Sequence, residues 1–251
     1  MTEVEWLACA DPDDLLEFLR DRASDRQFRL FMCACCRRLL PLLPRTPAHD
    51  RRLCEKYVAH GEQFADGLST WEEMAAALNE REFAKVSHEG YLAALAAKQA
   101  TYREVAGCSR PMLRGRNLIA HPVSTASGYS RTVMSRLQMN NTAAKGSTPT
   151  AKKRMATIAE KRYQIQLLHD IFGNPFQPTT TINSTWLHWN DGTAVKIAQT
   201  IYDERAFDRM PILADALEDA GCNNADILDH CRQPGEHVRG CWIIDALLGK
   251  E

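Results

Sequence analysis

Residues 24–40, SDRQFRLFMCACCRRLL, carry the hydrophobic pattern that most constrains this chain. The apolar positions recur at i, i+3, i+4, i+7, i+8, i+11 and i+12, which is the stripe of a helix buried along one side. These positions are Phe28, Phe31, Met32, Cys35, Cys36, Leu39 and Leu40. Ser24 or Asp25 can cap the start of the helix, and Pro41 ends it. The stripe places Cys35 and Cys36 in a hydrophobic seam, so we interpret them as core residues.

Helix-forming residues dominate the rest of the chain, and strand formers are scarce. We therefore expect an all-α fold, with an N-terminal helical bundle and a C-terminal lobe of short helices. The predicted boundaries are 1–106 for the first lobe, 107–150 for a basic and partly irregular segment, and 151–251 for the second lobe. With 45% hydrophobic and 25% charged residues, the composition excludes wholesale disorder.

The first residues carry acids where a secretory signal has a basic region, and no apolar run approaches the roughly 20 residues that span a bilayer. These features predict a cytoplasmic protein without a membrane partner. The chain has nine cysteines, an odd number. Because thiols stay reduced in the cytoplasm, we expect free and mostly buried cysteines rather than a disulfide framework.

Charge is segregated along the chain. Residues 109–162 contain 11 Lys and Arg against one acidic residue, whereas the flanking segments are both acidic. This basic block could neutralise phosphates or dock on an acidic protein surface, and it could also be a solvated loop. The candidate binding residues are Arg110, Arg114, Arg116, Arg131, Arg136, Lys152, Lys153 and Arg154.

The best candidates for metal ligands lie near the C-terminus. They are Cys222, His230, Cys231, His237 and Cys241. Zinc prefers four nitrogen or sulfur ligands, and a helix would place His237 and Cys241 on one face. The spacing lacks a close Cys-x2-Cys pair, and the cysteines could equally pack in the core. We therefore expect no cofactor, with structural zinc as the alternative.

The motifs of common enzyme classes are missing from this sequence. It contains no G-x-G-x-x-G, Walker loop, G-x-S-x-G or H-E-x-x-H. We interpret the acidic cluster between residues 203 and 219 as helix-capping and solvent-facing groups, and His169 beside Asp170 as a histidine serving a helix end. An enzyme site would have to be assembled from residues distant in sequence.

Several longer segments resemble an uncharacterised family of bacterial helical proteins. The segments are SDRQFRLFMCACCRR (24–38), DIFGNPF (170–176), IYDERAFDRMPILADALEDAGC (201–222) and HVRGCWIIDALLGK (237–250). The resemblance implies a helical fold, and it implies no activity, cofactor or catalytic residue. Between about residue 108 and residue 150 the chain departs from the family, with a basic Ser/Thr/Asn-rich stretch in place of an alanine- and arginine-rich helix.

From these features we expect a non-enzymatic interaction or adaptor protein. It would dock a protein partner through helix faces and the basic segment. The alternatives are a nucleic-acid-binding protein that does not read sequence, and an enzyme whose site forms only in three dimensions. The sequence does not indicate an oligomeric state.

Overall fold

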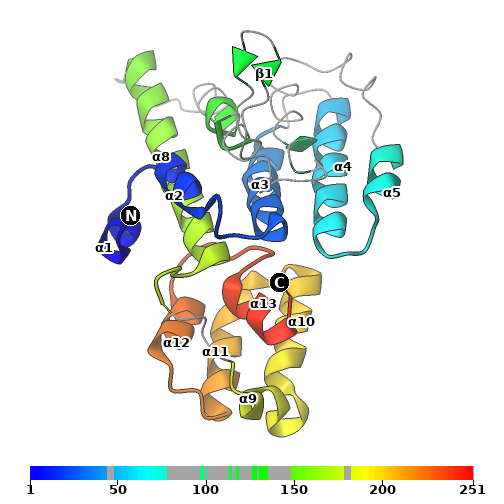
Figure 1. Ribbon diagram of the computed structural model, residues 1–251, viewed down its shortest axis with the longest axis vertical. Coiled ribbons are helices and arrows are strands. Elements are labelled where there is room, and N and C mark those ends of the chain that lie inside the picture. The colour runs from blue at the N-terminus through cyan, green and yellow to red at the C-terminus, as the bar shows by residue number, and fades with distance from the viewer. Residues whose placement is uncertain are drawn as a thin grey trace. The chain divides into compact units, whose positions relative to one another are not determined.

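The computed structural model describes residues 1–43, 48–77, 97–98, 100, 113–114, 117–118, 126–128, 130–134, 148–177 and 182–250 (Figure 1). Helices dominate these residues, so the prediction of an all-α fold is confirmed. The exception is a short antiparallel pairing of β1 (Leu113–Arg114) with β2 (Asn117–Leu118). None of the helices in the described ranges is both long and apolar enough to cross a membrane.

The chain divides into two compact units, Glu3–Ile165 and Gln166–Glu251, called here the N-terminal and C-terminal units. The division falls within α8 (Pro149–Phe172), whereas the predicted second lobe started at residue 151. The other helices with described bounds in the N-terminal unit are α1 (Glu3–Ala8), α2 (Pro12–Leu19), α3 (Asp25–Leu39), the 3-10 turn η1 (Leu40–Leu42), α4 (Ala48–Ala65) and α5 (Trp71–Ala77). Residues 126–128 and 130–134, inside the predicted irregular segment, are also helical.

Helix α3 is the central helix of the N-terminal unit and packs against α4 (Figure 1). Ser24 and Gln27 form the capping box at its start, as a cap near Ser24 predicted. Every residue of the predicted stripe is buried, but so are residues outside it, including Arg29. The Arg29 guanidinium lies 4.6 Å from the centre of the Phe64 ring. The helix is therefore buried on several sides, which the periodicity of one stripe did not indicate.

The cysteines in the described ranges are all free, as expected, and all of them except Cys9 are buried. Burial raises the pKa of the Cys35 and Cys36 thiols well above the usual value and the pKa of Cys54 to about 12. A thiol that stays protonated is a poor nucleophile. These cysteines are core residues.

A buried polar network crosses the N-terminal unit around Glu160 of α8. Its carboxylate, whose side chain is 0% exposed, accepts hydrogen bonds from Ser130 at 2.9 Å and Arg38 at 3.1 Å. Gln164 joins the network by donating to Glu160 and to the carbonyl of Ser127. Burial raises the pKa of Glu160, although the bonds from Ser130 and Arg38 oppose that rise. Since buried polar groups are costly unless paired, this network specifies how these segments pack.

The C-terminal unit is built from short helices. They are α9 (Ser184–His188), the 3-10 turn η3 (Trp189–Asp191), α10 (Thr193–Glu204), the 3-10 turn η4 (Phe207–Arg209), α11 (Met210–Asp219), α12 (Ala225–Arg232) and α13 (Trp242–Leu248). α10 packs against α11 and α13, and α11 packs against α12. Their apolar faces form one core that includes Ile201, Tyr202, Leu213, Leu217, Ile227 and Ile243.

Two local predictions for this unit need correction. The helix predicted to carry His237 and Cys241 begins only at Trp242, because residues 237–241 form a loop whose conformation is tied to other side chains. Asp208, which belongs to the acidic cluster predicted to cap helices, lies inside η4 and does not cap α11, whose N-cap is Arg209. Elsewhere in the unit, Asn224 accepts from the first turn of α12, and Gly173 follows α8 with a φ of +60°.

Gly173 is required for a second reason besides its left-handed backbone. A Cβ atom at this position would lie 3.2 Å from Cγ of Trp242, within the same unit. Gly249 has nearly the same φ, +62°, but a Cβ there would meet nothing within 4 Å. Comparing substitutions at these two glycines therefore distinguishes the cost of backbone strain from the cost of crowding.

We predict that Gly173→Ala lowers the free energy of unfolding by about 2–3 kcal/mol, since it adds crowding against Trp242 to the strain of a left-handed alanine. Gly249→Ala should cost only about 1 kcal/mol, the strain alone. Urea denaturation of the two variants measures the difference. Equal losses of unfolding free energy in the two variants would show that crowding against Trp242 does not affect stability.

We also predict that Glu160→Ala costs about 2–3 kcal/mol, because it leaves Arg38 and Ser130 without their buried acceptor. The value is at the lower end for a buried pair since the Arg38 side chain is 26% exposed. The matched control is Glu55→Ala, which breaks the exposed pair of Arg51 with Glu55 and should cost less than about 1 kcal/mol. A loss for Glu160→Ala no larger than that of the control contradicts the prediction.

Candidate metal centre

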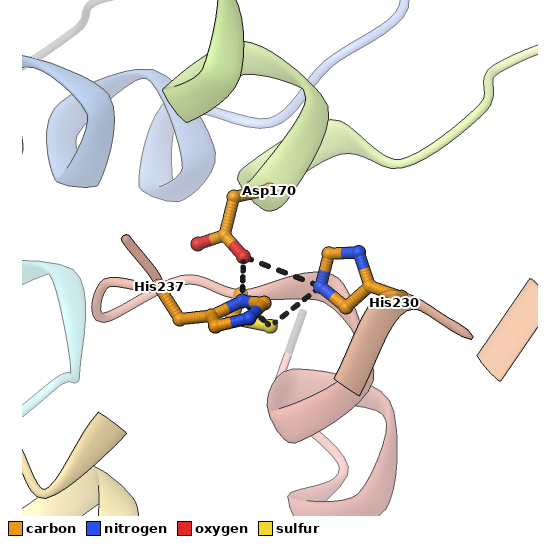
Figure 2. A group of neighbouring side chains, drawn as sticks. Asp170, His230 and His237 are labelled. Carbon is orange, nitrogen blue, oxygen red and sulfur yellow. Dashed lines mark hydrogen bonds and ion pairs between the residues drawn. The ribbon is translucent and has the colours of Figure 1, made fainter. Parts of the chain in front are cut away.

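Four side chains that can bind a metal converge within the C-terminal unit. Asp170 lies in the last turn of α8, His230 in α12, and His237 in the loop between α12 and α13. Cys241 is the residue immediately before α13. Figure 2 shows the Asp170 carboxylate pointing at the rings of His230 and His237, which come from different segments. The loop from 233 to 241 thus brings the third and fourth side chains back toward the end of α8.

The donor atoms of this Asp-His-His-Cys cluster all lie within 4.8 Å of one another. Oδ1 of Asp170 is 2.6 Å from Nδ1 of His237 and 3.2 Å from Nε2 of His230. The sulfur of Cys241 is 3.2 Å from the same Nε2 and 4.0 Å from Nδ1 of His237. Ligands at the edges of a tetrahedral zinc site are separated by about 3.3–3.6 Å. The spacings in the cluster bracket that range.

The cluster is nearly closed to solvent. The side chains of Asp170 and His237 are each 4% exposed, that of His230 is 9% exposed, and Cys241 is 0% exposed. Four protein donors with little access for water are typical of a structural metal site, whereas a catalytic site keeps a position open for water or substrate.

Asp170 is the anionic centre of the cluster. Burial alone would raise the pKa of its carboxyl, but the interactions with His230 and His237 outweigh burial and hold the pKa below its usual value. Its other oxygen, Oδ2, accepts a hydrogen bond of 2.9 Å from the backbone N–H of Val238. The carboxylate therefore fixes the start of the loop that carries His237.

Cys241 differs in charge from Asp170 when no cation is near. Burial raises the pKa of its thiol well above the usual value, and the negative charge of Asp170 raises it further. Without a metal the thiol is neutral. A divalent cation would reverse this preference, because a coordinating thiol loses its proton.

One polar atom of the cluster is left over. Nδ1 of His237 donates to Asp170, but its Nε2 is fully buried and has no hydrogen-bond partner among the described residues. A buried unpartnered nitrogen is rare in a well-packed protein. Hydrogen bonding alone does not account for every polar atom at this site.

The arrangement is unlike that of a Cys-His-Asp relay. In a relay the two ring nitrogens of the histidine face different partners, the nucleophile and the carboxylate. Here Asp170 and Cys241 both lie beside Nε2 of His230. The histidine cannot pass a proton from one to the other through its ring, and the sulfur is buried away from any substrate.

Three of the five predicted metal candidates belong to this cluster: His230, His237 and Cys241. The other two, Cys222 and Cys231, lie in the hydrophobic core of the C-terminal unit. Burial raises the pKa of Cys231 to about 12. His237 and Cys241 do not share a helix face as predicted, because both precede α13.

Asp170 is not among the predicted metal ligands, because the sequence around His169 and Asp170 indicates only a helix end. It lies 60 positions before His230, so no spacing connects the two. One physical signal was present. An acid in the last turn of a helix opposes the helix dipole, and such a residue needs compensation from elsewhere.

The predicted basic residues lie in different environments. Arg131 forms an ion pair of 2.8 Å with Asp13 and hydrogen-bonds Gln164, so it serves the N-terminal unit. Lys153 and Arg154 are exposed on α8, and Lys152 is half-buried there. Arg114 lies in β1. The residues outside the described ranges are Arg110, Arg116 and Arg136.

Comparisons with known proteins add no assignment. The chain matches no protein-family model, and no curated protein or solved structure is detectably similar to it. A role for this chain therefore has to be argued from the geometry of its own residues.

Proposed function

We propose that this protein is a non-enzymatic interaction module whose C-terminal unit is held together by one structural zinc ion. Asp170, His230, His237 and Cys241 would supply the four ligands. The observation that carries the proposal is the convergence of these four largely buried donors within 4.8 Å, although Asp170 lies 60 positions before His230.

Charge favours a divalent ion at this position. An ionised Asp170 and a Cys241 thiolate together carry two negative charges, and two neutral histidines add none. A Zn²⁺ ion would make the buried cluster neutral, which removes the cost of placing charge away from water. Mixed nitrogen, sulfur and oxygen donors suit zinc, whereas Mg²⁺ and Ca²⁺ require oxygen donors.

A structural role fits the position of the ligands. The ion would tie the end of α8 to α12 and to the loop before α13. That loop, residues 233–241, contains no helix of its own. Metal binding that requires the folded arrangement contributes directly to folding stability. A reducing compartment such as the cytoplasm, expected from the sequence, would keep Cys241 available as a ligand.

We infer an adaptor function because a closed metal site would stabilise the fold and leave no position for a substrate. A closed site supplies stability and no open position for chemistry. What the fold then offers is a set of rigid helix faces. Proteins that bind other proteins commonly use such surfaces. The partner is a macromolecule presenting a surface complementary to those faces.

One observation favours nucleic acid as a second candidate partner. Arg154, Ile158 and Arg162 are spaced at i, i+4 and i+8, so they share one exposed face of α8, and Lys153 lies beside it. Met155 on the same helix is 67% exposed. Cationic side chains along one helix face can contact phosphates without reading sequence.

We predict that the purified full-length chain, prepared without chelator, contains about one zinc ion per molecule by mass spectrometry of metals. Cys241→Ala and His237→Ala should weaken zinc binding by more than about 100-fold, since each removes a ligand. Cys231→Ala is the matched control, a buried thiol of the same unit outside the cluster, and it should retain the metal.

Zinc should also stabilise the wild-type protein. At a free zinc concentration about 100 times the dissociation constant, the gain is about 2.7 kcal/mol, or a rise in Tm of roughly 5–10 °C. Chelation should reverse it. A wild-type chain without zinc, and without a response of Tm to added zinc, would rule out the metal site.

For the basic face of α8, we predict a low-salt gel shift with duplex DNA that is lost when Lys153, Arg154 and Arg162 are replaced by Gln. High salt should abolish the same shift, because phosphate contacts release counterions. Lys196→Gln is a control for an exposed cation elsewhere, paired with Asp191. A shift that survives the triple replacement assigns nucleic-acid binding to other residues.

A further inference from the structure

We propose that Trp242 and Gln233 compete for one nitrogen of His230, Nδ1, and that this competition sets how tightly the cluster binds zinc. Trp242 is a positioning residue that holds His230 in the form that cannot ligate a metal, and Gln233 is the partner that supports the ligating form. This inference rests on the proposed zinc site and deepens it.

The geometry around Nδ1 of His230 carries the proposal. The indole Nε1 of Trp242 lies 3.3 Å from this nitrogen, and the amide nitrogen Nε2 of Gln233 lies 3.2 Å from it. The indole and imidazole ring centres are 5.3 Å apart. On the other side of the ring, Nε2 faces Asp170 and Cys241, as Figure 2 shows for the carboxylate.

An indole nitrogen donates hydrogen bonds and never accepts them. Nδ1 of His230 must therefore present its lone pair to Trp242. A neutral imidazole carries its one proton on the other nitrogen, which is Nε2. That proton points toward Asp170 and Cys241, where it satisfies the cluster in the absence of a metal.

Zinc requires the opposite tautomer. A neutral histidine that binds metal through Nε2 carries its proton on Nδ1, and this N–H donates to an acceptor in most metal sites. Two N–H groups, from His230 and Trp242, would then face each other. Zinc entry must break the bond between Trp242 and His230.

Gln233 can take over as the partner of Nδ1. Its side chain is exposed and ends in an amide that offers either N–H groups or a carbonyl oxygen. Turning the amide over presents the oxygen to the new Nδ1–H. Trp242 has less freedom, because its ring rests against Gly173. The indole therefore opposes the ligating tautomer, and the glutamine adapts to it.

The test is a competition titration of the full-length chain with zinc and a chelating indicator. Trp242→Phe keeps an aromatic ring and removes the N–H donor, so zinc should bind about three- to tenfold more tightly. Gln233→Ala removes the acceptor and should weaken binding by about tenfold. Matched controls are Trp189→Phe and Gln199→Ala, residues of the same unit outside the cluster, which should leave the affinity unchanged.

A second readout follows the proton itself. Long-range nitrogen–proton NMR spectra of histidine side chains distinguish the two tautomers. His230 should carry its proton on Nε2 without zinc and on Nδ1 with zinc. The direction of the Trp242→Phe effect is diagnostic. If Trp242 had only a structural role, its replacement would weaken zinc binding by the protein.

The outcomes separate this inference from the zinc site itself. If wild-type protein binds zinc but Trp242→Phe binds it equally or more weakly, the inference is wrong and the zinc site stands. A His230 proton that stays on Nε2 in the zinc-bound protein has the same meaning. If wild-type protein binds no zinc, both proposals fail together.

Discussion

The buried carboxylate of Asp170 is the constraint on which the C-terminal unit depends. It holds two histidines and the backbone of Val238 around one point, although these residues come from separate segments. A buried anion is expensive unless its charge is compensated. The loop that leads to α13 is therefore not free to adopt its own conformation, because it carries part of that compensation.

The same cluster can be described with and without a metal, and the two descriptions differ in where protons lie. Without a metal, His230 and His237 both direct N–H groups at the cluster. Zinc would convert Cys241 to a thiolate, and the buried charges would then cancel. The bond between Trp242 and His230 distinguishes the descriptions, because an indole can donate to only one of the two histidine tautomers.

The two units differ in how their buried polar side chains are paired. In the N-terminal unit, Glu160 is paired with Arg38, Ser130 and Gln164, so the network is satisfied by side chains that the chain itself supplies. In the C-terminal unit the polar cluster has one carboxylate, one thiol and two histidines, and no arginine or lysine among its described partners. The first network is complete as it stands, whereas the second suits a cation.

Local patterns in the sequence determined the helical class, the stripe of α3, the cap near its start, and the burial of Cys35 and Cys36, because each depends on residues within a few turns of one another. The sequence also indicated His230, His237 and Cys241 as metal candidates, since only 11 positions separate the first from the last. Only the tertiary structure decided that Asp170 joins them, that Cys222 and Cys231 do not, and that α3 is buried beyond its stripe. These facts depend on which helix faces meet, and packing over long sequence separations leaves no periodic signal in the chain.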